Sequence, residues 1–116
     1  MSRKFLLYLT DILEAIRKIS TYTSEMNEAD FLLNGLVLDA CYHNFLVIGE
    51  SVKQLPDDLR QQHPNIPWKS IAGLRDMLAH EYFRVDDRIL WDVVQNHILP
   101  LESAAKSLLE GLERDS

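Results

Sequence analysis

Apolar residues recur along almost the whole chain in alternating steps of three and four, which is the spacing of an amphipathic helix. The first stripe predicts a helix over residues 4–20 and consists of Phe5, Leu9, Ile12, Ile16 and Ile19. A second stripe predicts a helix over residues 31–55 and contains Val37, Cys41, Ile48, Val52 and Leu55. Pro56 should end this second helix, because proline lacks the N–H that a helix interior requires.

Shorter helical pieces are marked by residues that cap or begin helices. Asn27 has Asp30 three residues later, a pair that suits the start of a short helical stretch. Residues 56–63 have room for one or two further turns before Pro64. These pieces supplement the long helices and do not form a bundle by themselves.

Two further helices are predicted in the second half of the chain. Pro67 stands near the first position of a helix that runs to about His80 or Tyr82. Asp86 is a good N-cap for the last helix, which Pro100 should bend or interrupt. The apolar stripe of this last helix is Trp91, Val94, Ile98, Leu101, Ala105, Leu108 and Leu112. Four principal helices with short connections, plus the short helical pieces, predict an all-α antiparallel helical bundle.

Composition narrows the class of protein. A length of 116 residues fits a single domain over residues 1–116, and 47% hydrophobic residues are enough for a packed core. The single cysteine, Cys41, excludes an intrachain disulfide, and its place on an apolar stripe predicts core packing. No apolar run approaches the roughly 18 residues that a membrane span needs, and acidic residues follow the start too soon for a secretory signal. We expect a cytoplasmic protein.

The net charge of −6 argues against broad, non-specific binding of nucleic acids, which depends on neutralising phosphates. If RNA is the substrate, its site must be local or completed by a partner. Four histidines without carboxylate or cysteine partners at ligand spacing predict no metal site. The sequence also contains no Gly-rich phosphate loop and no serine-nucleophile motif, so we expect no cofactor.

Functional residues concentrate in residues 71–82. On a helix turning about 100° per residue, one side of this segment should face the core; it carries Ile71, Leu74, Met77 and Leu78. The opposite side carries Ala72, Gly73, Arg75, Asp76, Ala79 and His80. An ordinary solvated face would carry more Glu, Lys or Gln, which are better helix formers than Gly or Asp. The mixture of small and functional residues predicts a face that another molecule approaches closely.

Asp76 and His80 are four residues apart and therefore neighbours on this face. A carboxylate beside an imidazole holds its tautomer, which suits acid–base work. Arg75 lies about 140° around a regular helix from His80, so one helix does not direct both at one phosphate. Either the helix ends near His80, or a second copy of the chain completes the site in a two-fold dimer. A single Arg, His or Tyr would more often be structural; their combination favours function.

The segment Arg75-x4-His80-x-Tyr82 resembles the Arg-x4–6-His signature of ribonucleases of the HEPN superfamily, in the form found in HepT-like toxins. The likeness covers nearly the whole chain. It includes the opening helix around Asp11, Asn44 with Ile48-Gly49-Glu50, the His63-Pro64 segment before Trp68, and Val85-Asp86 after the motif.

This resemblance implies a function and a set of partners. It implies a HEPN-type bundle acting as a metal-independent ribonuclease toxin of a toxin–antitoxin pair, with RNA, including tRNA, as the substrate class. Arg75 would hold the phosphate, His80 would move protons and Asp76 would orient His80. The implied partners are a second copy of the chain and a minimal nucleotidyltransferase antitoxin that adds AMP to Tyr82; no DNA and no membrane are implied.

The sequence departs from the family at the middle helix. Members typically have arginine just before the asparagine and Leu-Glu just after it, whereas this chain has His43, Phe45 and Leu46. By resemblance, the face that carries His43, Asn44 and Glu50 lines the dimer cleft. His43 either weakens RNA affinity or joins the chemistry; we favour the former, because a neutral histidine clamps phosphate poorly compared with arginine.

A rival interpretation is a non-catalytic HEPN subunit that docks a nucleotidyltransferase or a nucleotide without cleaving RNA. The acidic charge and His43 favour this rival, and the intact motif opposes it. A plain dimeric structural bundle is a weaker third alternative.

Overall fold

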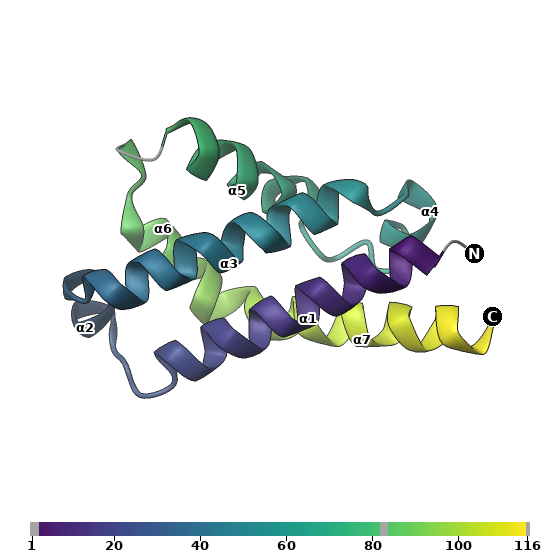
Figure 1. Ribbon diagram of the computed structural model, residues 1–116, viewed down its shortest axis with the longest axis horizontal. Helices are drawn as coiled ribbons and strands as arrows, with labels where there is room; N and C mark the ends of the chain where they lie inside the picture. The colour runs from purple at the N-terminus through teal and green to yellow at the C-terminus, as the bar shows by residue number, and fades with distance from the viewer. Residues whose placement is uncertain (1–2, 82–83, 116) are drawn as a thin grey trace.

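The computed structural model describes residues 3–81 and 84–115, which form seven α-helices and no strand (Figure 1). The helices are α1 (Arg3–Thr23), α2 (Glu28–Leu33), α3 (Gly35–Gln54), α4 (Asp57–Arg60), α5 (Trp68–His80), α6 (Asp87–Asn96) and α7 (Ile98–Arg114). The molecule is elongated, 45 × 29 × 23 Å, and both ends of the chain lie at the same end of it. This arrangement confirms the predicted all-α class.

The long helices run antiparallel to their neighbours. α1 packs against α3 on one side and α7 on the other, and α3 packs in turn against α5 (Figure 1). The predicted apolar stripes supply the core between them: Leu9, Ile12, Ile16 and Ile19 of α1 and Cys41, Ile48 and Val52 of α3 are all buried. Burial raises the pKa of the Cys41 thiol to about 12, so it packs as a neutral side chain, as expected.

Local capping fixes several helix ends where the sequence predicts them. The Asn27 side chain accepts a hydrogen bond from the backbone N–H of Asp30 at 2.8 Å, and the Asp30 carboxylate accepts one from the N–H of Asn27. Asp86 caps α6 by accepting from the N–H of Arg88 at 3.0 Å. α3 ends immediately before Leu55 and Pro56.

Two of the predicted long helices are each divided. The helix expected over residues 31–55 breaks at Asn34, whose side chain caps α3 by accepting from the N–H of Val37 at 3.1 Å. The last predicted helix breaks at His97, between α6 and α7. Pro100 explains this second break, because its ring clashes with the carbonyl four residues earlier and it has no N–H to donate.

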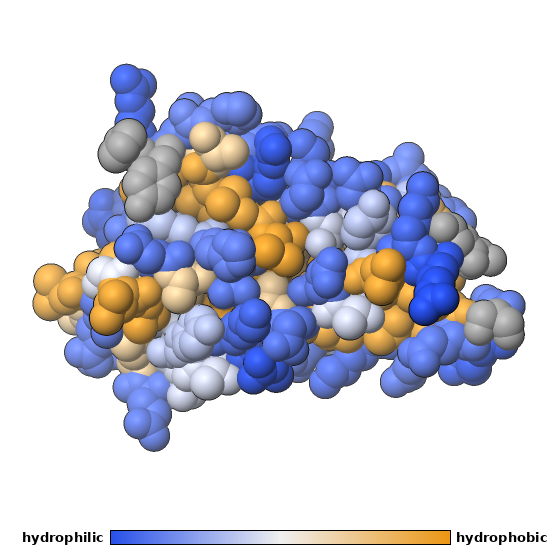
Figure 2. Space-filling view, in the orientation of Figure 1, coloured by the Kyte–Doolittle hydropathy of each residue, from blue (hydrophilic) through white to orange (hydrophobic). Residues whose placement is uncertain are grey.

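The corner between α2 and α3 leaves two large apolar side chains in solvent. Leu33 is 87% exposed and Leu36 is 86% exposed. Figure 2 shows apolar surface gathered at this end of the molecule. The corner lies far along the bundle from the end where the termini meet, and the candidate site lies between the two ends.

Candidate active site

A groove of about 580 Å³ opens between α1, α3 and α5. It is lined by Tyr8, Asp11, His43, Leu46, Val47, Glu50, Ser51, Arg75 and Ala79. Three residues that the sequence singles out, His43, Glu50 and Arg75, therefore meet in one place. The shared face expected for His43 and Glu50, seven residues apart on α3, is the α3 wall of this groove.

Gly49 brings Arg75 to the groove by allowing α3 and α5 to touch. A Cβ atom at Gly49 would lie 2.7 Å from the Cβ of Arg75 and 2.9 Å from its backbone nitrogen. These separations are too short for any residue with a side chain, so glycine is required at this crossing. The Cβ of Arg75 therefore lies directly beside the α3 backbone.

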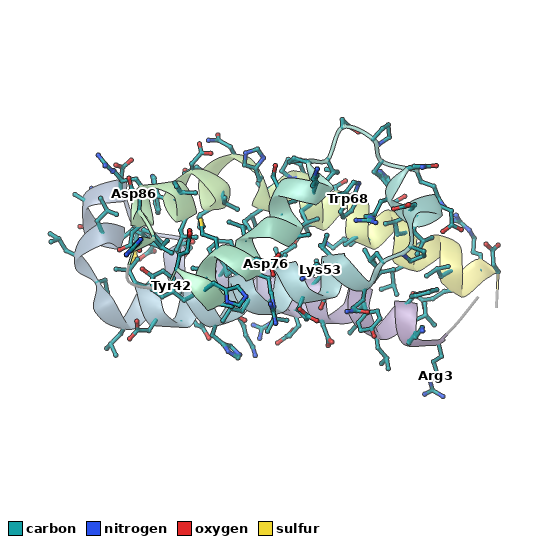
Figure 3. The ribbon with its side chains drawn as sticks, turned by 90° about the horizontal axis from the view of Figure 1, so that it is seen from above. Arg3, Tyr42, Lys53, Trp68, Asp76 and Asp86 are labelled. Carbon is teal, nitrogen blue, oxygen red and sulfur yellow. The ribbon has the colours of Figure 1, made fainter. Side chains whose placement is uncertain are left out.

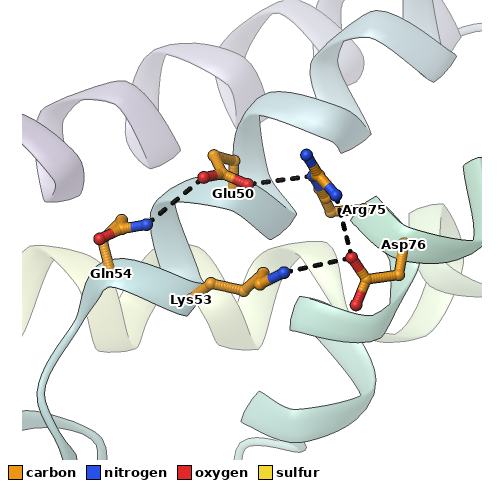
Figure 4. Close-up of polar contacts among 5 residues, drawn as sticks. All are labelled: Glu50, Lys53, Gln54, Arg75 and Asp76. Atoms are coloured by element: carbon orange, nitrogen blue, oxygen red, sulfur yellow. Dashed lines mark hydrogen bonds and ion pairs between the residues drawn. The ribbon is translucent and has the colours of Figure 1, made fainter. Parts of the chain in front are cut away.

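Two carboxylates hold the Arg75 guanidinium (Figure 4). Its Nε lies 3.1 Å from Oε2 of Glu50, and its Nη1 donates to Oδ1 of Asp76 at 3.1 Å. Gln54 Nε2 donates to the other oxygen of Glu50 at 3.3 Å. The arginine is thereby fixed in direction from two sides, which is the preorganisation that binding a tetrahedral phosphate requires.

Lys53 completes this polar cluster. Its Nζ donates to Oδ1 of Asp76 at 3.1 Å, the same oxygen that accepts from Arg75. Figure 3 shows Lys53 and Asp76 side by side on the neighbouring helices α3 and α5. The hydrogen bond from Lys53, and then that from Arg75, lowers the pKa of Asp76 below its ordinary value, so this carboxyl is ionised at neutral pH.

His80 stands apart from the groove. It is the last residue of α5 and is exposed, and it is not among the groove-lining residues. Among the described residues, Asp76 pairs with Lys53 and Arg75 rather than with His80. α5 does end at His80, the first of the two alternatives, but Arg75 and His80 both lie within it and so remain about 140° apart.

The remaining candidates occupy different environments. Asn44 is 4% exposed and its side-chain Nδ2 donates to the carbonyl of Ala40 at 2.8 Å, so the structure does not bring it to the groove. Its spacing explains this, because three and four residues separate it from the buried Cys41 and Ile48. Tyr82 lies outside the described residues.

Sequence reasoning does not identify three residues of the site: Lys53, Tyr8 and Asp11. Lys53 and Asp76 are 23 residues apart, so only the packing of α3 on α5 reveals their contact. Tyr8 and Asp11, three apart on α1, flank the buried stripe and line the groove. Helical spacing could have shown that both residues lie beside the buried stripe of α1. It could not have shown that this side of α1 faces α3 and α5.

Over residues 3–81 and 84–115, no three His, Cys, Asp or Glu side chains gather in a way that could hold a metal ion. In the same part of the chain, no helix is both long and apolar enough to cross a membrane.

An antiparallel helical bundle that carries Arg-x4-His on one helix, with the arginine at an interhelical groove, defines a HEPN-type domain. The family that matches residues 12–108 is described as ribonuclease HepT-like. The chain belongs to this HepT-like ribonuclease family, and ribonuclease is accordingly its enzyme class. No solved structure matches the chain significantly.

Proteins similar to the chain include whole members of this family and part of a longer protein. "Probable ribonuclease HepT" of Thermococcus cleftensis is 40% identical over 108 residues, which are 93% of this chain and 98% of that protein. "Putative RNase" of Caldanaerobacter subterraneus subsp. tengcongensis is 37% identical over 103 residues, 89% of this chain and 92% of that protein. "Gamma-glutamylcyclotransferase and putative RNase" of Methanocaldococcus jannaschii is 36% identical over 115 residues, 99% of this chain; the chain spans only about half, 52%, of that longer protein.

Proposed function

We propose that the chain is the toxin of a toxin–antitoxin pair, a ribonuclease that cleaves RNA without a metal ion at a cleft between two copies. The observation that carries the proposal is Arg75, which lies in the groove and is oriented by Glu50 and Asp76. Membership of the HepT-like ribonuclease family supports RNA as the substrate class, and tRNA is one candidate within it.

In the proposed reaction, the RNA supplies its own nucleophile. His80 takes the proton of a 2′-hydroxyl, the 2′-oxygen attacks the adjacent phosphorus, and the bond from phosphorus to the 5′-oxygen breaks. The 5′-oxygen leaves with a proton returned by a histidine, and the other product ends in a 2′,3′-cyclic phosphate. Arg75 neutralises the charge that grows on the phosphate oxygens.

Two copies are needed because one copy separates its own functional groups. His80 lies outside the groove that Arg75 lines, so a two-fold dimer would bring the His80 of one copy towards the Arg75 of the other. Gly73 is exposed and, seven residues before His80, lies on the same side of α5 as that histidine, whereas Ala79 lines the groove with Arg75. Both residues are small enough for close contact across that interface. A Cβ at Gly73 would meet nothing within 4 Å, so the space beside it is open to a second molecule.

The proposed antitoxin is a minimal nucleotidyltransferase that adds AMP to Tyr82. Each AMP would bring a bulky nucleotide and a negative phosphodiester close to the motif, and both would oppose the entry of RNA. The working location is the cytoplasm, where RNA substrates and ATP for this modification are present.

One observation favours the rival, a non-catalytic subunit that docks a nucleotidyltransferase or a nucleotide. Both Glu50 and Asp76 pair with Arg75, so the arginine is partly neutralised before any phosphate arrives. In this rival function the cluster would be a structural tie between α3 and α5, and loss of His80 would have no effect on growth.

Growth of cells that express the chain separates the two functions. We expect wild type to arrest growth and His80→Ala to permit it, because the variant lacks the group that moves protons. Lys106→Gln is the matched control on α7, where Lys106 pairs with Glu102 at 3.7 Å, and it should arrest growth as wild type does. Arrest by His80→Ala at equal expression would contradict the proposed toxin.

A further inference from the structure

Lys53 and Arg75 direct their cationic groups at one oxygen atom, Oδ1 of Asp76, each at 3.1 Å. They come from different helices, α3 and α5, which pack closely at Gly49. The position between the two cations thus already holds an anionic oxygen. A non-bridging phosphate oxygen has the same charge and the same capacity to accept two hydrogen bonds.

Lys53 matters as a second cation because the charge of Arg75, the first cation, is already partly neutralised by carboxylates. Arg75 is in contact with both Glu50 and Asp76, and among the groove-lining residues it is the only Lys or Arg. His43 stands where the resemblance leads us to expect an arginine, and the whole chain has a net charge of −6. A further local cation is therefore needed to attract a phosphodiester, and Lys53 is one in direct contact with the cluster.

Both cations can be reached from solvent. The side chain of Lys53 is 37% exposed and that of Arg75 is 36% exposed. An ammonium group has three donors, so Lys53 can contact an incoming phosphate before it exchanges its bond to Asp76. The lowered pKa of Asp76, for which Lys53 is the largest cause, agrees with a positive field at this point.

We propose that Lys53 is a substrate-binding residue that, together with Arg75, clamps an RNA phosphodiester, and that Asp76 holds the two cations in place until the RNA arrives. This inference rests on the proposed ribonuclease function and adds a contact to it. It also supplies the positive charge that His43 does not. A phosphate that enters from solvent replaces Asp76 as the shared acceptor of the two cations.

The test is binding of a fluorescent single-stranded RNA whose 2′-oxygens are methylated, so that no 2′-hydroxyl is available for attack. The dissociation constant is measured over a series of salt concentrations. We expect Lys53→Gln to weaken binding roughly 3- to 10-fold at low salt and to lower the slope of log affinity against log salt by about 0.7. Lys53→Arg keeps the charge and should keep the slope, and the control Lys106→Gln should match wild type.

Asp76→Ala separates a binding role for Lys53 from a structural one, because alanine has no oxygen to accept from either cation. If Lys53 only ties α3 to α5, Asp76→Ala cuts the same tie and weakens RNA binding as much as Lys53→Gln does. If Lys53 contacts RNA, Asp76→Ala keeps both cations and removes a competing negative charge, which offsets the lost preorganisation. Its affinity should then fall less than that of Lys53→Gln, and its salt slope should not fall.

An unchanged salt slope in Lys53→Gln, or equal losses of RNA affinity in Lys53→Gln and Asp76→Ala, would overturn the inference. Cleavage of an unmodified oligonucleotide by wild type is measured alongside. If wild type cleaves while Lys53→Gln binds with the wild-type slope, only the role of Lys53 is refuted. If wild type neither binds nor cleaves, both proposals fail.

Discussion

Arg75 has little freedom at its position. Its backbone lies against Gly49, and its guanidinium is held by Glu50 and Asp76. A side chain fixed in this way loses little entropy when it binds a phosphate, which is the advantage of a preorganised site. The same contacts fix the direction of the guanidinium but offset part of its charge.

Tyr82 is the residue at which we expect regulation. Incubation with the proposed nucleotidyltransferase antitoxin and ATP should add mass increments of AMP to wild type and none to Tyr82→Phe, because phenylalanine lacks the acceptor oxygen. The control is Tyr22→Phe, which changes an exposed tyrosine on α1 and should be labelled as wild type is. Intact-mass spectrometry reads the result. Equal labelling of Tyr82→Phe and wild type would exclude this tyrosine as the acceptor.

The crossing of α3 and α5 is the feature of the helices that builds the site. Gly49→Ala places a Cβ 2.7 Å from that of Arg75, so the helices must move apart or strain must be accepted. We expect a loss of roughly 1–3 kcal/mol in the free energy of unfolding, the usual cost of overpacking. Chemical denaturation measures this loss.

Gly111→Ala is the control for the Gly49 variant. A Cβ at Gly111 meets nothing within 4 Å, and alanine is a better helix former, so this change should be neutral or stabilising by up to about 1 kcal/mol. A Gly49→Ala protein as stable as Gly111→Ala would contradict the tight crossing.

The sequence could predict features that depend on residues close together in the chain, but not those that depend on how two helices pack. The ends of α2, α3 and α6 follow from Asn27, Pro56 and Asp86, because caps and prolines act within one turn. The break at Asn34 had a local signal, Asn followed by Gly, but a continuous apolar pattern masks it. The contact of Lys53 with Asp76 had none, since it depends on how two helices pack.

The site residues divide in the same way. Arg75 and His80 could be found from a short motif, and His43 with Glu50 from the resemblance, which implies that their face lines the cleft. Asn44 is adjacent to His43 in the chain, but its side chain is buried. Its spacing of three and four residues from Cys41 and Ile48 places it on the buried side of α3. Asp76 was expected to pair with His80, but in the structure it pairs with Arg75, its neighbour in the chain, and with Lys53, which the packing of α3 on α5 brings to it.

At the scale of the whole molecule, separation of Arg75 from His80 predicts a dimer. Light scattering at micromolar concentration should give twice the mass of the chain, because the open face of α5 that carries Gly73 and His80 is then covered. Gly73→Arg puts a long cation into that face and should yield monomers that retain their helical content. A wild-type protein that is monomeric at these concentrations would argue against a shared cleft.

The proposed function depends above all on cleavage of RNA by the side chains of this protein. It is tested by cleavage of end-labelled RNA with purified wild type and His80→Ala, both in excess EDTA. We expect wild type to cleave at a rate that EDTA does not reduce, and His80→Ala to cleave about 100-fold more slowly or worse, the range lost with a general acid–base group. Circular dichroism should show that the variant is folded. Cleavage that stops in EDTA, or that continues at the wild-type rate in His80→Ala, would contradict the proposed mechanism.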